Sequence, residues 1–259
     1  MRGILGRVLL GLLLLAVAAG AGIGYAAWER FHRPGPLTHR TTLVIPEGAG
    51  VATIARRLSR GGVIADNDRA RLLFRVGVRV LDAGGRLRAG EFAFPARSSM
   101  RGVVDVLVSA DPVVHKLTVA EGLTTTEILT RVNRAPGLKG RVEPVPDEGE
   151  LLPETYHYHW GDERAAVVRR MAASMDALLA ELWPQRAADL PLDTPQQAVI
   201  LASIIEEETG VASERAKVAG VFVNRLRRGM RLQSDPTVIY ALTRGEGPLD
   251  RRLTRSDLK

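Results

Sequence analysis

An uncharged apolar run near the N-terminus constrains this chain more than any other feature. The run Val8–Trp28 (VLLGLLLLAVAAGAGIGYAAW) contains 21 residues, enough for a helix to cross the hydrocarbon core of a bilayer. Tyr25 and Trp28 stand near its end, where aromatic side chains favour the membrane interface. A cleaved signal peptide is the alternative, because Leu9–Ala21 has the composition of an apolar h-region. We favour an uncleaved anchor, because the apolar character continues beyond any small-residue cleavage site.

The residues on either side of this run set the expected topology. A head of seven residues precedes the run, so either interpretation places the bulk of the chain outside the cytoplasm. Charge alone does not decide the orientation, because arginines lie on both sides: Arg2, Arg7, Arg30, Arg33 and Arg40. The next stretch, residues 29–40 (ERFHRPGPLTHR), contains proline and is predicted to be an extended linker.

Composition and charge narrow the functions open to the remaining chain. With 46% hydrophobic and 25% charged residues, the 259-residue chain is expected to be globular beyond the anchor. The net charge of +7 leaves an anionic polymer or lipid open as a partner. Nucleic acid is not expected as a partner, because the arginine pairs are scattered without interleaved aromatic residues. The absence of cysteine excludes disulfides, thiolate catalysis and cysteine-based metal sites.

No cofactor or metal is expected. His157 and His159 lie close to Glu154 in the sequence and form the one pattern that resembles a metal site. A metal site needs a third ligand from the protein, and the neighbouring sequence does not supply an evident one. Two surface histidines are therefore the preferred interpretation.

A repeat occupies the middle of the chain. Leu43–Leu58 (LVIPEGAGVATIARRL) aligns without a gap on Leu117–Val132 (LTVAEGLTTTEILTRV) at an offset of 74 residues. Each copy is predicted to form a short strand, a turn at Glu-Gly and an amphipathic helix. The unit is either a generic strand–turn–helix or a small carbohydrate-binding module. A strand is also predicted at residues 89–94 and a helix at 100–109, so the expected fold class is α+β.

A cluster of carboxylates follows a strongly apolar helix. Thr194 is a predicted N-cap, with Pro195 in the first turn and Gln197 completing a capping box. Residues 198–205 (AVILASII) are apolar or small on every face, which predicts a helix buried on all sides. This helix runs directly into three glutamates, and Gly210 is the predicted stop.

Three carboxylates at the C-terminal end of a helix oppose its macrodipole. Burial, neighbouring like charges and the dipole are all expected to raise a glutamate pKa, as a general acid requires. Glu208 is expected to face the core, because it follows Leu201 and Ile204 on one helical stripe. Glu206 is expected to line a groove, and Glu207 to be solvated. The alternative is an ordinary solvated acidic helix end.

Polar residues concentrate again further along the chain. Ser213–Arg228 is a predicted second helix, capped by Ser213 and followed by Gly229. The segment Met230–Tyr240 is predicted to be a loop whose polar side chains could donate and accept hydrogen bonds with a sugar, namely Gln233, Ser234, Asp235 and Thr237. The alternative is a simple Asp-Pro turn.

These segments together resemble the membrane-anchored endolytic murein transglycosylases, the MltG or YceG-like family. The resemblance rests on colinear segments from about Thr41 onward: LVIPEGAGVATIARRL, RAGEF, LTVAEGLTTTEIL, ELLPETYHY, LASIIEEET, SERAKVAGVFVNRLRRGMRLQSDPTVIY and LTRSDLK. Residues 201–240 are the most specific part. The ELLPETYHY segment departs from the aromatic-rich version usual in the family, and family members continue beyond the LTRSDLK-like segment. The resemblance therefore implies a catalytic domain that is incomplete at Lys259.

The resemblance implies an architecture and a reaction. It implies a single-pass inner-membrane anchor within residues 1–28, a linker at 29–40, a periplasmic LysM-like subdomain at 41–110 and a catalytic domain with a buried catalytic helix at 111–259. The implied reaction cleaves MurNAc–GlcNAc bonds of nascent peptidoglycan strands to 1,6-anhydro ends and so terminates elongation. A peptidoglycan synthase is an open partner, and a non-enzymatic, membrane-tethered glycan-binding scaffold is the alternative function.

The family motif also assigns residues. Glu208 matches the catalytic second glutamate of the E-x-E-T motif, and Glu206 matches the first. Gln233, Asp235 and Thr237 match a loop expected to border the substrate groove.

Overall fold

The protein is described by a computed structural model that covers residues 2–258. Met1 and Lys259, which end the first and last segments expected from the sequence, lie outside the described residues, as do the side chains of residues 2–6 and of Val8. The chain forms two compact units, residues 1–113 and 114–259. The fold is mixed α+β with a long apolar helix at its N-terminus, as the sequence predicts at this level.

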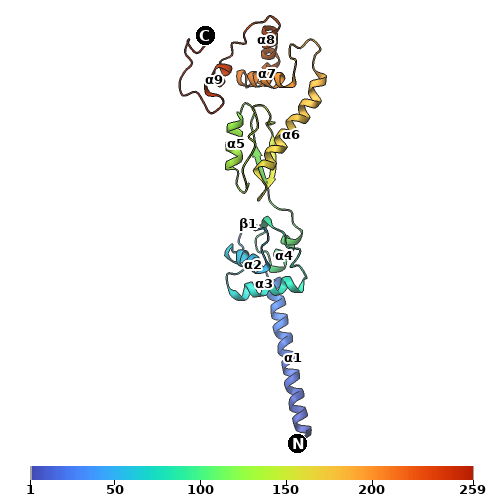
Figure 1. Cartoon of the computed structure of the whole chain (residues 1–259). Helices are drawn as coiled ribbons and strands as arrows, with labels where there is room; N and C mark the ends of the chain where they lie inside the picture. The colour runs from blue at the N-terminus through green and yellow to red at the C-terminus, as the bar shows by residue number, and fades with distance from the viewer. Residues whose placement is uncertain (1, 259) are drawn as a thin grey trace. The chain divides into compact units, whose positions relative to one another are not determined.

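The first unit contains four helices and two strands within the described residues (Figure 1). They are α1 (Arg2–His32), β1 (Thr41–Ile45), α2 (Val51–Arg60), α3 (Asp68–Val80), β2 (Gly90–Phe94) and α4 (Met100–Ser109). Strands β1 and β2 pair antiparallel, with Leu43 opposite Phe92. The helices bury their apolar faces together with this hairpin in one core, around Phe74, Phe92 and Phe94.

Helix α1 carries the apolar run and continues into the core of the first unit. Residues 9–32 are long and apolar enough to cross a membrane, a property that a signal sequence shares. The predicted linker at residues 29–40 is wrong in its first part, because residues 29–32 continue the helix. Phe31 and Leu37 are both buried in the core. Removing two large apolar side chains from water is favourable in free energy, so this short polar segment packs against the first unit.

The second unit begins with a similar hairpin. It contains β3 (Val114–Thr118), α5 (Thr125–Arg134), β4 (Thr155–His159), α6 (Arg164–Leu182), α7 (Pro195–Glu208), α8 (Arg215–Arg227) and α9 (Asp235–Thr243), together with two short 3₁₀ turns at 183–185 and 212–214. Strands β3 and β4 pair antiparallel, with Leu117 opposite Tyr156. The hairpin, α5 and α6 share a core centred on Val132, Val167 and Met171.

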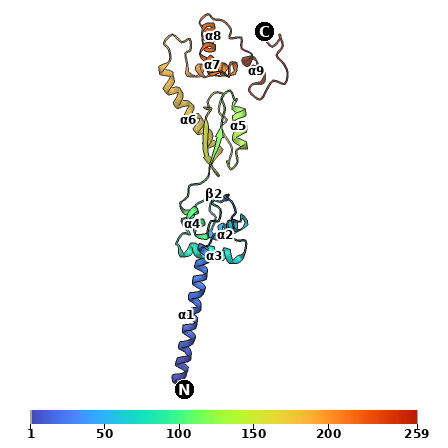
Figure 2. The ribbon, with the colours of Figure 1, turned by 180° about the vertical axis from the view of Figure 1, so that it is seen from behind.

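The predicted repeat is confirmed as two strand–turn–helix units. Helices α2 and α5 begin at residues 51 and 125, which keeps the 74-residue offset. Gly48 and Gly122 both have left-handed backbones, with φ of 68° and 78°, a conformation that glycine adopts without steric cost. In each unit the strand pairs with a later strand rather than with the other copy (Figure 2).

Helices α7, α8 and α9 form the last part of the second unit. A small core joins α7 to α8 through Leu201, Ile204 and Phe222. The expectation that α7 is buried on all sides is wrong, because Ile200, Ala202 and Ser203 are exposed. An apolar composition makes burial favourable on every face, but the described neighbours of α7 cover only part of its surface.

Candidate functional site

Helix α7 begins at the N-cap predicted from the sequence, but its C-terminal end differs from the prediction. The Thr194 hydroxyl accepts a hydrogen bond from the backbone N–H of Gln197 at 3.2 Å, which satisfies one amide of the first turn. The Gln197 side chain accepts from the N–H of Asp193, so the predicted capping box closes one residue earlier. The helix ends at Glu208 with an extended Thr209 as its C-cap, rather than through a left-handed Gly210.

The three glutamates at the end of α7 turn to three different neighbours. Glu206 forms an ion pair with Arg215 at the start of α8, with both carboxylate oxygens 3.0 Å from the same guanidinium nitrogen. Its side chain retains 27% of its exposure. A cation close to the C-terminal end of α7 offsets part of the charge that the helix dipole disfavours there.

Glu207 lies against the turn of the second repeat. A methyl group on Gly122 would lie 2.5 Å from Oε1 of Glu207. Gly122 therefore leaves the space that this carboxylate occupies, in addition to adopting a left-handed backbone. Glu207 is exposed, as predicted. Its neighbour in the turn between β3 and α5 could not be predicted from the sequence of α7.

Glu208 is bound by a buried serine at the start of α9. The Ser234 hydroxyl, on a residue that is only 3% exposed, donates to Oε2 of Glu208 at 3.0 Å. Ser234 holds the N-cap position of α9, but its side chain makes no capping bond to that helix. The expected burial of Glu208 is wrong: its side chain is exposed. The stripe through Leu201 and Ile204 is buried as predicted, but the small core that it joins does not extend along α7 beyond Ile205.

The polar segment after α8 is partly helical. The predicted loop ends at Ser234, because α9 begins at Asp235 with a proline in its first turn. Gln233 has a left-handed φ of 55°, and its Oε1 accepts from Arg225 at 3.2 Å. Thr237 donates to the carbonyl of Ser234 at 2.6 Å, which fixes the first turn of α9. Of the predicted polar set, the structure brings Ser234 to Glu208, while Asp235 is exposed and Gln233 is held by α8.

The helix before this segment also begins differently from the prediction. Ser213 lies in the 3₁₀ turn at 212–214 rather than at a helix N-cap. Helix α8 begins at Arg215, and Gly229 beyond its end is left-handed, which suits the predicted stop. The shift places Arg215 within reach of Glu206.

A further carboxylate, Glu148, was not predicted from the sequence and contacts the start of α5 and the first turn of α7. Glu148 accepts hydrogen bonds from the backbone N–H and the hydroxyl of Thr125, at 2.9 Å and 3.1 Å. Its backbone carbonyl accepts from Gln196 of α7 at 3.2 Å. Burial raises the pKa of the nearby Tyr240 phenol, and the Glu148 carboxylate raises it further. Glu148 thus joins α5, α7 and α9, and no local pattern marks it because its partners are distant in the sequence.

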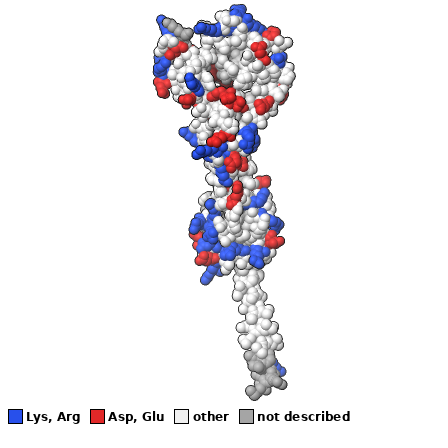
Figure 3. Space-filling view, in the orientation of Figure 1, with Lys and Arg blue, Asp and Glu red and all other residues white. Residues whose placement is uncertain are grey.

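This arrangement leaves Glu208 exposed, and its carboxylate can bind a ligand and exchange a proton with it. Acidic side chains gather on the visible face of the second unit (Figure 3). Glu208 has one oxygen held by Ser234, and the described residues give its other oxygen no hydrogen bond. Such a group can donate a proton to, or accept one from, a ligand in the same position. Among residues 2–258, the structure shows no group of three potential metal ligands.

The sequence is similar to a described protein family over most of its length. The model of the YceG-like family matches residues 43–259. A Bacillus subtilis strain 168 protein named endolytic murein transglycosylase is 26% identical over 233 residues, which cover 76% of this chain and 62% of the relative. A protein of the same name from Streptococcus pneumoniae serotype 2 strain D39 is 26% identical over 243 residues, which cover 77% of this chain and 43% of the relative. The chain thus spans less than two thirds of the length of these relatives.

A solved structure is also similar. The crystal structure of a YceG-like protein from Listeria monocytogenes aligns with a TM-score of 0.46 and 25% identity, covering 85% of this chain and 79% of that one.

Proposed function

The chain belongs to the YceG-like family, and from this premise we propose that it is a membrane-anchored endolytic transglycosylase of peptidoglycan. The proposed substrate is the nascent glycan strand, and the proposed product is a strand that ends in 1,6-anhydro-MurNAc. The observation that carries the proposal is the exposed Glu208, which a buried serine holds at the end of α7. The names of the relatives from Bacillus subtilis and Streptococcus pneumoniae supply the reaction class.

In the proposed mechanism a single carboxyl group serves as both acid and base. Glu208 first donates its proton to the oxygen that links MurNAc C1 to GlcNAc, and the C1–O bond breaks. The resulting carboxylate then takes the proton of the MurNAc C6 hydroxyl as O6 bonds to C1. The product is the 1,6-anhydro ring, the proton returns to Glu208, and no water is consumed. Glycosidases that hydrolyse the bond normally need a second carboxylate, which this reaction does not require.

The contacts of Glu208 suit this role. Ser234 holds Oε2, so the carboxyl group has a defined orientation, while Glu208 as a residue stays exposed and can meet a ligand. Glu206 is engaged by Arg215, which favours a supporting position in the substrate groove rather than proton transfer. We assign Gln233, Ser234, Asp235 and Thr237 to the same groove, because they lie at or next to the start of α9.

The remaining parts of the chain receive roles from the same proposal. Helix α1 is a single-pass anchor in the bacterial cytoplasmic membrane, and the residues that follow it lie on the outer side. Residues 41–110 form a LysM-like subdomain, and residues 111–259 belong to the catalytic domain. Peptidoglycan strands are the partner that this assignment requires, and a peptidoglycan synthase is a candidate second partner.

The test compares two isosteric variants one residue apart. Glu208→Gln keeps the shape of the side chain and removes the proton that it exchanges, so release of 1,6-anhydro ends from purified peptidoglycan should fall by about 10²–10⁴-fold. Glu207→Gln changes a neighbouring exposed carboxylate in the same way and should remain within about a few-fold of wild type. Circular dichroism verifies that both variants fold. Full activity in Glu208→Gln, or its loss in Glu207→Gln, would show that the assignment within the cluster is wrong.

A second candidate function is a tethered glycan-binding scaffold without turnover. The paired strand–turn–helix units favour it, because such small units can bind a polymer without catalysis. The scaffold predicts that the wild-type protein cosediments with peptidoglycan, releases no anhydro ends, and binds equally well as Glu208→Gln. Measurable release by the wild type excludes it.

A further inference from the structure

Helix α3 exposes an apolar stripe that the packing of the first unit does not use. Leu72, Val76 and Val80 are 57%, 49% and 79% exposed. They follow one another at intervals of four residues, so they lie on one face of the helix. The opposite face is buried through Ala70, Phe74 and Val78. Helix α3 therefore has apolar residues on both faces, and those on the outer face have no partner within residues 2–258.

Arginines lie among these exposed apolar residues. Arg69, Arg75 and Arg79 are exposed on the same side of α3. Arg71, on the inner side, is instead engaged by Asp66 and Asp68 at 2.8 Å and 2.7 Å. Asp68 is thus already paired, so the outer face carries a net positive charge. Apolar residues with flanking arginines are typical of helices that lie in the interface of a membrane.

Helix α3 lies next to the end of α1. Both views show α3 crossing the end of α1, at the side of the first unit from which α1 extends (Figures 1 and 2). The ring of Phe31 packs directly on Gly77 of α3, and Phe31 is 6% exposed. Helix α1 therefore enters the domain core without a flexible linker. If its apolar run spans a bilayer, α3 lies at the surface of that bilayer.

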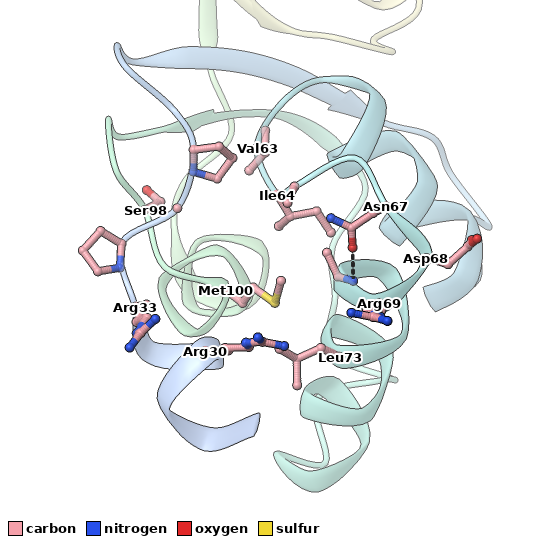
Figure 4. Close-up of a pocket in the computed structure, with 15 residues that line it drawn as sticks. Arg30, Arg33, Val63, Ile64, Asn67, Asp68, Arg69, Leu73, Ser98 and Met100 are labelled. Carbon is pink, nitrogen blue, oxygen red and sulfur yellow. Dashed lines mark hydrogen bonds between the residues drawn. The ribbon is translucent and has the colours of Figure 1, made fainter. Parts of the chain in front are cut away.

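A groove lies between the end of α1 and helix α3. It has a volume of about 670 Å³, and its lining includes Arg30 of α1, Arg69 and Leu73 of α3, and Met100 of α4. Figure 4 shows the two arginine side chains on the same side of the groove as Leu73. Two guanidinium groups beside apolar side chains suit a phosphate head group whose acyl chains lie along α1.

We propose that the outer face of α3 and the adjoining groove form a second membrane contact, which holds the first unit flat on an anionic lipid surface. The proposal rests on the membrane anchor assigned to α1 above. The occupant is the bilayer that contains α1. Leu72, Val76 and Val80 enter the boundary between head groups and acyl chains, while Arg69, Arg75 and Arg79 bind lipid phosphates.

The test uses the natural absence of cysteine in the chain. A fluorophore is attached to a single cysteine introduced by Val76→Cys, Leu15→Cys or Thr42→Cys in the full-length protein, which is then reconstituted in vesicles of phosphatidylcholine and phosphatidylglycerol. Leu15 reports on insertion of α1. Thr42 is an exposed residue of β1, a strand that lies at the other end of the first unit from α3 in Figure 1. Quenching by lipids that carry a nitroxide near the head group or deep in the acyl chain measures depth.

The label at Val76 should be quenched by the shallow nitroxide, the label at Leu15 by the deep one, and the label at Thr42 by neither. If the Leu15 label is quenched while the Val76 label behaves like the Thr42 label, α1 spans the bilayer but the proposed contact of α3 is wrong. If the Leu15 label is not quenched, the anchor itself is wrong and the inference fails with it. Neither outcome depends on catalysis, so the transglycosylase assignment is tested separately.

A charge variant tests the role of the arginines. Each arginine near an anionic surface contributes about five-fold in membrane partitioning. Arg75→Gln together with Arg79→Gln should therefore reduce quenching of the Val76 label in vesicles with phosphatidylglycerol, and should have little effect in pure phosphatidylcholine. Arg56→Gln with Arg57→Gln on α2 removes the same charge elsewhere in the unit and should change neither. Equal signals from the two double variants would overturn the assignment of these arginines to lipid head groups.

Discussion

Gly77 of α3 should not tolerate a methyl group, although alanine favours helices. The Cβ of an alanine at this position would lie 2.5 Å from Cζ and 2.8 Å from Cδ2 of Phe31, and closer still to Cε2. The ring cannot move aside freely, because it is buried in the core of the first unit. Gly77 therefore has a packing role at the junction of α1 and α3.

The magnitude follows from two opposing terms. Replacing glycine by alanine inside a helix stabilises it by about 1 kcal/mol. Overpacking a buried contact costs about 1–3 kcal/mol, and three ring atoms within 2.8 Å place this contact in the upper part of that range. Gly77→Ala should therefore lower the free energy of unfolding of the first unit by about 1–2 kcal/mol.

Gly102 in α4 is the matched control. Its added Cβ would lie 3.6 Å from the nearest atom, the Ser99 hydroxyl oxygen, which is ordinary van der Waals contact. Gly102→Ala should therefore gain helix propensity without a clash and stabilise the unit by about 0.5–1 kcal/mol. The two substitutions are chemically identical and should have opposite signs.

Hydrogen exchange of the full-length protein measures both changes in one segment. Amides of β2, residues 90–94, share the core but carry neither substitution. Because about 1.4 kcal/mol corresponds to ten-fold, Gly77→Ala should accelerate their exchange by about 5–30-fold, and Gly102→Ala should slow it. Phe31→Leu combined with Gly77→Ala should recover part of the loss. Slower exchange in Gly77→Ala would refute the packing of Phe31 on α3, and with it the rigid entry of α1 into the domain.

Two further predictions concern the second unit. Ser234→Ala removes the hydrogen bond to Glu208 and should reduce turnover by about ten-fold, because that bond contributes about 1–1.5 kcal/mol. Thr237→Val removes a hydrogen bond to the backbone carbonyl of Ser234 and should reduce turnover less in the same assay. The Arg251 hydrogen bonds, and then the Thr254 amide and hydroxyl, hold the pKa of Asp257 well below its ordinary value of 3.8. Above the ordinary pKa of 3.8 the Asp257 carboxylate therefore stabilises the turn that contains Thr254 and Asp257. This stabilisation is lost as the pH falls toward the lowered pKa. In the wild type, the protection of the Thr254 amide against hydrogen exchange should fall as the pH is lowered. In Asp257→Asn this protection should be low at every pH.

Local signals in the sequence predicted the elements well. Thr194 caps α7 and the 74-residue repeat yields two strand–turn–helix units, because a cap or a left-handed turn depends on a few adjacent residues. The strand and helix expected at residues 89–94 and 100–109 are also present, at 90–94 and 100–109. Each of these features is fixed by periodicity or by a residue type that tolerates one backbone conformation.

Features that depend on distant partners were predicted less well. The sequence indicated a carboxylate cluster, but not that Glu206 pairs with Arg215 or that Glu207 meets Gly122. It also indicated a core position for Glu208, which is exposed. Helical periodicity tells which residues share a face, whereas only the neighbouring elements determine where on that face the burial ends.

The sequence by itself therefore determined the apolar N-terminal helix, the repeat, the acidic end of α7 and the resemblance to the YceG-like family. The tertiary structure alone decided which groups meet: Ser234 with Glu208, and Phe31 with Gly77. Ser234 follows Glu208 by 26 residues, and Phe31 precedes Gly77 by an even longer stretch. Contacts of this kind are set by how the apolar faces of whole elements pack together, because each element must bury its stripe against the surfaces that the others leave available.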